Sequence, residues 1–283
     1  MIRALGLAFL AGVSFAQVGY FRFDIDQDKL SGAPDHSWMN QPLGPSDRLY
    51  VRNGRFWRVG PDLTPGTEDD ERVRLYGVNL AFGANFPEPG DAWRVAARLR
   101  KLGVNLVRFH HMDTQPDSNA SNAGSILTTE PYPTLNPAAV ARLRGFLDAL
   151  KANGIYANIN LKVGYLFRPS VDGIPPLPGG MAMPTQSKPL HIIHPRAIEL
   201  QKEFTRKVLE ALALRDDPVL AMVEISNESS LIWSWQARDL ERVLLGEYKS
   251  VMEREWNRFL AAKYPSTEAL RAAWGGEDAD GPE

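Results

Sequence analysis

Apolar and polar positions alternate in four short segments of the chain, and a stretch with helical periodicity follows each of them. The alternation predicts strands at residues 73–82, 105–111, 155–162 and 220–228. The 3.6-residue periodicity predicts helices at residues 91–102, 137–153 and 195–214, and one long helix or a broken pair at about 236–263. Four strand–helix repeats in series predict a parallel sheet with right-handed crossover connections.

The two faces of these predicted strands differ in polarity. Side chains two residues apart in a strand point to the same face. On one face the four strands carry, in order, Gly77 and Asn79; Arg108 and His110; Tyr156, Asn158, Asn160 and Lys162; and Glu224, Ser226 and Glu228. In a doubly wound sheet both faces would be apolar, although polar strand ends in a ligand cleft keep that alternative open. One apolar face and one face that grows polar toward the carboxyl ends favours a barrel with its site at the upper rim.

The segment before the first strand has two further features. Residues 1–16 contain a positive residue, an apolar run and a small-x-small cleavage site, which predicts a signal peptide and a secreted or periplasmic protein. Residues 17–72 are expected to form an N-terminal extension. Within it, Asn53-Gly54 lies between two β-forming segments and predicts a hairpin with a type I′ turn. The barrel portion is expected over residues 73–275, followed by a polar tail at 276–283.

Composition and charge narrow the classes of partner. The formal net charge is -2 and no Lys/Arg-rich block occurs, which argues against a nucleic-acid partner. Beyond the predicted signal, no apolar run is long enough to cross a bilayer, so no membrane association is expected. The chain has no cysteine, and its 44% hydrophobic content is enough for a sizeable core.

The fourth predicted strand ends in the pair Asn227-Glu228, which is the first candidate for catalysis. A carboxylate on an apolar strand costs several kcal/mol unless it is paired or used. We therefore expect Glu228 to be a catalytic acid and Glu224, deeper in the strand, to pair with Arg108 or Lys162. A solvated strand end is the plain alternative for Glu228.

Aromatic and histidine side chains supply the remaining candidates. Trp233 and Trp235 would share one face of an extended segment, and Trp233 is the preferred aromatic contact for a ligand. His110, His111 and Asp113 raise the alternative of a metal site. However, adjacent histidines on a strand face opposite ways, so at most one of them can join a given site. A ligand contact for His110 is the preferred interpretation, without metal or cofactor.

Three stretches carry a resemblance to a known family: GVNLVRFHH at 103–111, GIYANINLK at 154–162 and VEISNE at 223–228. They resemble the clan A glycoside hydrolases, the cellulase-type (β/α)8 barrels similar to glycoside hydrolase family 5. Residues 256–275 also look like the helix after the fourth strand in related β-galactosidase-type enzymes. The resemblance implies an α/β fold, a TIM barrel of which only about the first four βα repeats are present, preceded by a small β-hairpin extension.

The resemblance also implies roles for individual residues. In that clan the Glu of Asn-Glu is the general acid/base of a retaining mechanism, which would be Glu228, and the Asn that holds the sugar 2-hydroxyl would be Asn227. A second glutamate, the nucleophile, would lie roughly 5 Å away near the end of a seventh strand, beyond residue 283. The expected substrate contacts are Asn227, Arg108, His110, Asn160, Lys162 and Trp233. Lys162 stands where many members carry a histidine.

These observations predict a secreted retaining glycoside hydrolase that acts on a β-linked polysaccharide or oligosaccharide. The missing C-terminal half of the barrel is expected as its structural partner, and the 283-residue piece alone is expected to be inactive. Two alternatives remain open: a non-catalytic or degenerate carbohydrate-binding barrel module, and a metal-dependent hydrolase on the same barrel.

Overall fold

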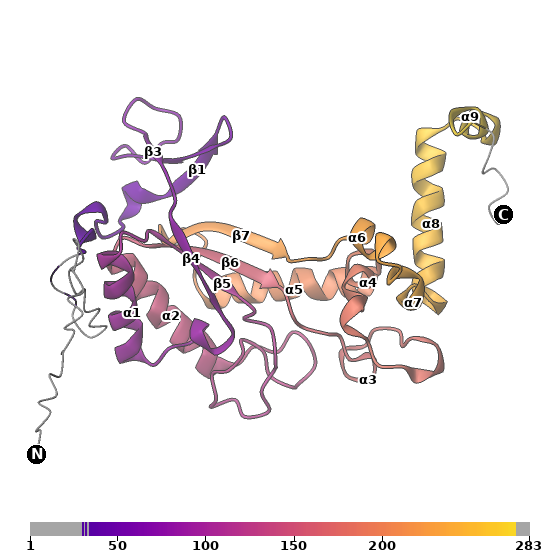
Figure 1. The fold of residues 1–283 in the computed structure, drawn as a ribbon, viewed down its shortest axis with the longest axis horizontal. Coiled ribbons are helices and arrows are strands. Elements are labelled where there is room, and N and C mark those ends of the chain that lie inside the picture. Colours follow the sequence, from indigo (N-terminus) through magenta and orange to yellow (C-terminus); the bar gives the residue numbers. More distant parts are fainter. Residues whose placement is uncertain (1–29, 31, 33, 276–283) are drawn as a thin grey trace, which may run out of the picture.

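The computed structural model of the chain describes residues 30, 32 and 34–275 (Figure 1). The predicted signal peptide at 1–16 and the polar tail at 276–283 lie outside the described residues. Within the part that is described, no helix is both long enough and apolar enough to cross a membrane.

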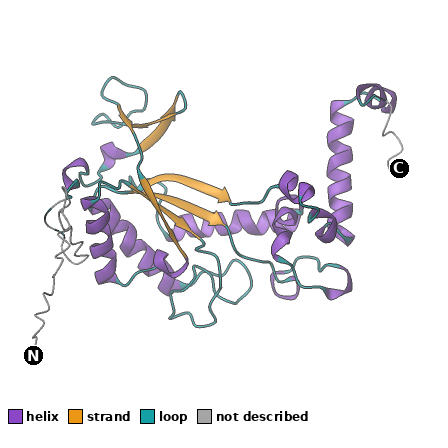
Figure 2. Ribbon diagram, viewed as in Figure 1, coloured by secondary structure: helices purple, strands orange, loops and turns teal. Residues whose placement is uncertain are grey.

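The strands form two sheets, one antiparallel and one parallel (Figure 2). The antiparallel sheet has the order β1 (Leu49–Arg52), β2 (Arg55–Arg58) and β3 (Glu71–Val73). The parallel sheet has the order β4 (Gly77–Ala81), β5 (Leu106–His110), β6 (Tyr156–Lys162) and β7 (Leu220–Ser226). The chain is therefore of the mixed α/β class, and its parallel strands follow one another in sequence order, as predicted.

The antiparallel sheet begins with the predicted hairpin. Asn53 and Gly54 both have left-handed φ angles, 51° and 69°, as a type I′ turn requires. The single strand expected at 73–82 is wrong, because Val73 ends β3 and a new strand starts at Gly77. The side chain of Asn105 explains the break: it accepts from the backbone N–H of Tyr76 and donates to the carbonyl of Arg74. Two backbone groups between the strands thus form hydrogen bonds with a side chain and not with a neighbouring strand.

Three helices cover one face of the parallel sheet: α1 (Pro89–Lys101), α2 (Pro137–Ala152) and α5 (Pro195–Ala211) (Figure 1). They follow β4, β5 and β6 and agree with the predicted helices to within about one turn. Each has proline in its first turn, and Asn136 caps α2 by accepting from the N–H groups of Ala138 and Ala139. The strand residues that face these helices are fully buried: Val107, Phe109, Ala157, Ile159 and Leu161.

The helix expected after the fourth parallel strand does not return to the sheet. The chain instead forms α6 (Leu231–Gln236), α7 (Leu240–Val243), α8 (Gly246–Lys263) and α9 (Thr267–Ala273). Figure 1 shows α8 and α9 extending away from β7, and α8 contacts α4 (Lys188–Ile193), which follows the short helix α3 (Pro169–Asp172). Ile225 of β7, which alternation placed against a helix, is 73% exposed as a result.

Candidate active site

A bidentate ion pair joins Arg108 of β5 to Glu224 of β7 on the face of the sheet opposite the helices. The distances are 2.6 Å from Nε to Oε1 and 2.7 Å from Nη2 to Oε2. From β6, which lies between them, Asn158 Nδ2 donates to Oε1 at 2.5 Å and Asn160 Nδ2 donates to Oε2 at 3.1 Å. The predicted pairing of Glu224 with Arg108 is thus confirmed, and the alternative pairing with Lys162 does not occur.

These four donors determine the charge state of Glu224. Hydrogen bonding from Arg108 is the main reason that the pKa of Glu224 lies below its ordinary value. The same bond raises the pKa of Arg108. Because both carboxylate oxygens already accept two hydrogen bonds, we interpret Glu224 as an organising residue rather than as a base or nucleophile.

Arg108 also orients Asn227, which follows the end of β7. The guanidinium donates from Nη1 to Asn79 Oδ1 at 3.0 Å and from Nη2 to Asn227 Oδ1 at 3.1 Å. The backbone N–H of Asn227 donates to the carbonyl of Lys162 at 2.9 Å, which holds this residue beside β6. With its oxygen directed to the arginine, the side chain of Asn227 presents its Nδ2 group as the donor for a ligand.

Glu228 lies beside this network, but the residue is not part of the strand. β7 ends at Ser226, and Glu228 is an exposed residue with a left-handed φ of 52°. The assumption that Glu228 shares a strand face with Glu224 is therefore wrong, because alternation stops at Ser226. The carboxylate is nevertheless close enough to contribute to the raised pKa of Arg108, after the larger effect of Glu224. A left-handed conformation in a non-glycine residue is strained, and such strain is frequent at functional sites.

Two adjacent histidines end β5, and their rings lie together. His110 Nδ1 is 3.0 Å from the Nδ2 donor of Asn160, so Nδ1 is the acceptor and Nε2 carries the proton. Burial lowers the pKa of both His110 and His111, and the charge of Glu228 acts in the opposite direction on both. The ring centroids are 4.2 Å apart because His111 leaves the strand with a φ of 55°. The expectation that the two rings face opposite ways is therefore wrong.

Lys162 is not brought into the network. The residue is only about 3% exposed, and its Nζ donates to the carbonyl of Tyr165 and lies 3.9 Å from Asp113 Oδ2. Burial lowers the pKa of Lys162 to about 8. Asp113 in turn accepts from the backbone N–H groups of Val163, Gly164 and Tyr165 at 2.9–3.0 Å. Lys162 thus supports the loop after β6 through Tyr165 and Asp113.

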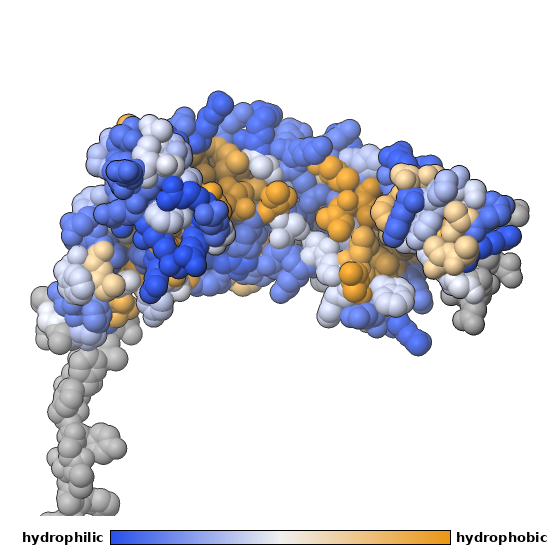
Figure 3. All heavy atoms as spheres, turned by 90° about the horizontal axis from the view of Figure 1, so that it is seen from above, coloured by the Kyte–Doolittle hydropathy of each residue, from blue (hydrophilic) through white to orange (hydrophobic). Residues whose placement is uncertain are grey.

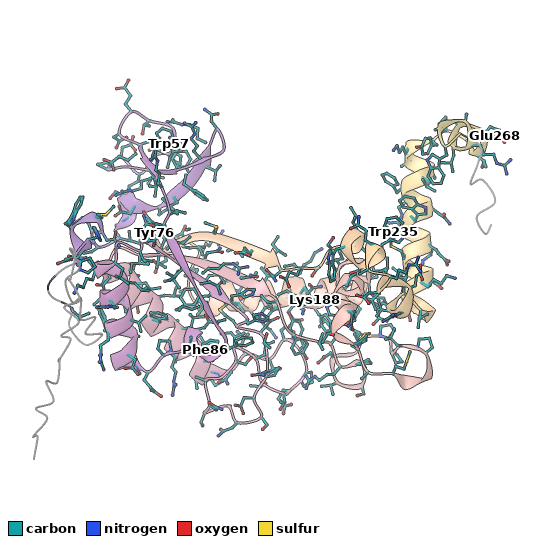
Figure 4. All side chains as sticks on the ribbon, in the orientation of Figure 1. Trp57, Tyr76, Phe86, Lys188, Trp235 and Glu268 are labelled. Carbon is teal, nitrogen blue, oxygen red and sulfur yellow. The ribbon has the colours of Figure 1, made fainter. Side chains whose placement is uncertain are left out.

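The two tryptophans lie on a helix rather than on an extended segment. Ser230 caps α6 by accepting from the N–H of Trp233 at 3.1 Å. Side chains two residues apart in an α-helix are about 200° apart around its axis, so Trp233 and Trp235 do not share a face. Their exposed fractions are 65% and 64%, and Figure 4 shows Trp235 at this helix.

Two residues that complete the site were assigned to the polar face by the alternation, but no role was predicted for them. Asn79 and Asn158 were placed on the polar face without a role, yet both hold members of the ion-pair network. The alternation gave Phe82 no role, because it was assigned as the last residue of the first strand. No group of three or more histidine, aspartate or glutamate side chains among residues 30, 32 and 34–275 is arranged to hold a metal ion.

Comparisons with known proteins give little further information. No family model matches the chain, and a search of curated proteins gives no match. Among solved structures, the chain is similar to an endo-1,4-beta-mannanase from Rhizomucor miehei, with 13% identity and a TM-score of 0.42. The similarity covers 64% of this chain and 48% of the mannanase chain, so the chain spans about half the length of that enzyme. At this level of identity and TM-score, the likeness says nothing about the chemistry of the chain.

Proposed function

We propose that this chain carries the acid/base side of a retaining glycoside hydrolase site for a β-linked polysaccharide or oligosaccharide. The observation that supports this most directly is the 3.1 Å hydrogen bond from Arg108 Nη2 to Asn227 Oδ1. It fixes an amide donor immediately before Glu228, at the carboxyl end of a parallel strand. Glycoside cleavage needs a proton donor beside a group that binds a hydroxyl of the sugar and holds it in place.

In the proposed mechanism Glu228 acts twice. As a carboxylic acid it donates its proton to the glycosidic oxygen while the bond from that oxygen to the anomeric carbon breaks and a second carboxylate, the nucleophile, bonds to that carbon. As a carboxylate it then accepts a proton from the water that releases the sugar from the enzyme. Asn227 Nδ2 and His110 Nε2 would donate to sugar hydroxyls and hold the ring, whereas Arg108 and Glu224 hold Asn227.

The proposal requires a nucleophile from outside the described residues. A retaining mechanism needs a second carboxylate roughly 5 Å from the acid, and Glu224 is fully engaged by its four donors. Residues 1–16 would direct export of such an enzyme.

Several surfaces are compatible with further barrel walls. β4 and β7 each have one edge without a strand partner in the described part of the chain, and Ile225 is largely exposed. A hollow of about 800 Å³ lies at the other end of β7, and both leucines and charged residues line it, among them Leu214, Leu220, Arg206 and Asp217. Figure 3 shows hydrophobic atoms gathered over the sheet and over the region of α6. We propose that the parallel sheet is the first half of a (β/α)8 barrel.

The test is the Glu228→Gln variant in the natural gene product, assayed for kcat on a panel of β-linked glucans, mannans and xylans. Loss of the proton donor should lower kcat by about 10²–10⁴-fold with little change in stability. Glu253→Gln, on the exposed side of α8, is the matched control and should leave kcat unchanged. A Glu228→Gln enzyme with near-normal kcat would remove Glu228 from the acid role.

A non-catalytic carbohydrate-binding module is the second candidate. The four hydrogen bonds that Glu224 accepts favour this second candidate. They leave this carboxylate, which lies in the same network as Asn227, without a role as the nucleophile. An assay of the natural gene product with a β-linked polymer distinguishes the two candidates. An enzyme hydrolyses the polymer and releases new reducing ends, whereas a binding module binds the polymer and releases none.

A further inference from the structure

Two strained residues meet at the carboxyl ends of β4 and β5. Phe82 has a φ of 56° and His111 a φ of 55°, both in the left-handed region that bulky side chains avoid. Their rings are stacked, with centroids 4.6 Å apart and an interplanar angle of 14°. Gly83 would adopt a left-handed φ at no steric cost, yet the strained position is occupied by the neighbouring phenylalanine.

The imidazole beneath Phe82 is held from three sides. His111 Nδ1 lies 2.9 Å from Thr114 Oγ1, and the His110 ring packs edge-on against His111. Gly164 closes the third side: a Cβ at this position would approach Thr114 Oγ1 to 1.8 Å and His111 Nδ1 to 3.0 Å. The ring that supports Phe82 is therefore fixed, and Phe82 loses little freedom when a ligand covers it.

Phe82 is also accessible to a ligand. The residue is 45% exposed although its ring is stacked on His111. Phe86, labelled in Figure 4, follows at the same end of β4, and Asn85 ties this segment to β5 by donating to the His110 carbonyl at 2.6 Å. The stacked pair thus lies one residue from His110, which Asn160 connects to Glu224.

We propose that Phe82, stacked on His111, is a platform on which a sugar ring of the substrate binds through its apolar C–H face. This inference rests on the proposed function and adds a subsite to the same site. A rigid exposed aromatic face beside hydrogen-bond donors is the arrangement that recognises a pyranose ring, whose faces are apolar and whose edge carries hydroxyls. Thr114 is a positioning residue that keeps His111 under Phe82.

The test measures binding rather than turnover. The full chain is titrated with mannotetraose, cellotetraose and xylotetraose, and affinity is followed by NMR chemical-shift changes and calorimetry. Phe82→Ala should weaken binding of the preferred tetrasaccharide about fivefold to tenfold, while Phe82→Trp should retain or improve it. Tyr76→Ala is the matched control, because Tyr76 is an exposed aromatic residue at the opposite end of β4 (Figure 4). It should change affinity by less than about twofold.

Thr114 provides an independent variant. Thr114→Val should weaken binding and shift the NMR titration of His111, and Thr114→Ser should restore both, a pattern that a purely structural role would not give. An affinity for Phe82→Ala within twofold of the unaltered chain would overturn the platform, as would no binding of any of the three tetrasaccharides. The proposed function fails by a different result, an active Glu228→Gln enzyme, so the two failures are distinguishable.

Discussion

Arg108 and Glu224 are 116 residues apart in the chain, and two hydrogen bonds of 2.6 and 2.7 Å join them across the intervening strand β6. Asn158 and Asn160 of β6 complete the shell of Glu224, so three parallel strands contribute to one carboxylate. Since Arg108 also holds Asn227, the ion pair determines how the end of β7 is presented. The network is therefore both a structural link and the support of the candidate active site.

Removal of the Glu224 charge should destabilise the fold. Glu224→Gln leaves Arg108 without its ionic partner in a partly buried site, where hydrogen bonds to charged groups contribute about 1.5–3 kcal/mol. We expect the free energy of unfolding, measured with urea at pH 7, to fall by about 1–3 kcal/mol. Glu210→Gln is the control, since Glu210 forms a 2.8 Å pair with Arg206 on the surface of α5. It should cost less than about 0.5 kcal/mol, and equal losses at the two positions would contradict this account.

The same ion pair predicts how the free energy of unfolding changes at acidic pH. The pKa of folded Glu224 lies below its ordinary value of 4.5, chiefly through its hydrogen bond from Arg108. The folded state therefore binds fewer protons than the unfolded state, so this contribution is present above pH 4.5 and is lost as the pH falls through the folded pKa. Urea unfolding at pH 7, 5 and 3 should show a smaller acid loss for Glu224→Gln than for the unaltered chain. An equal loss of stability with falling pH in the two proteins would show that Glu224 does not cause the acid sensitivity.

Sequence alternation predicts the part of this site that lies inside strands. Arg108, His110, Asn160 and Glu224 were assigned to one face by parity, and hydrogen bonds join them there. The order of the parallel strands also follows from the chain, because strand–helix repeats constrain the crossovers.

The same approach fails where the strands end. Phe82, His111 and Glu228 all adopt left-handed φ angles, which a two-residue repeat does not encode. Lys162 has a long flexible side chain that turns under the loop after β6 to reach Asp113. Helical periodicity locates α8 correctly but does not specify what the helix packs against.

The burial of Lys162 predicts that the free energy of unfolding changes at alkaline pH. Burial lowers its pKa to about 8, whereas an unfolded lysine keeps its ordinary value of 10.5. Between these values the unfolded state binds more protons, so this residue raises stability as the pH increases from 8 to 10.5. We expect a gain of about 1–3 kcal/mol in the free energy of unfolding relative to Lys162→Met, which has no such proton.

The Lys162→Met variant itself should fold. Removing the lysine takes away the charged partner of the buried Asp113 and so has a cost. The three backbone donors that Asp113 keeps limit this cost, and an apolar side chain of similar length suits the site between Tyr165 and Phe167. Paired urea curves at pH 7, 8, 9 and 10 provide the measurement. A difference between the two proteins that does not change with pH would mean that Lys162 does not titrate in this range.

The strained backbone of Glu228 predicts opposite effects of glycine at two glutamate positions. A left-handed conformation costs a residue with a Cβ about 1–2 kcal/mol, which glycine does not incur. Glu228→Gly should therefore be more stable than Glu228→Ala by about 1 kcal/mol, although both variants remove the candidate acid. At Glu253, an exposed position in the interior of α8, glycine should instead be less stable than alanine by about 0.5–1 kcal/mol. Urea unfolding of the four variants tests both signs, and the same order of glycine and alanine at the two positions would show that the backbone of Glu228 is unstrained. If the signs differ as expected, the chain maintains a destabilised residue where catalysis is proposed, which a merely solvated strand end would not require.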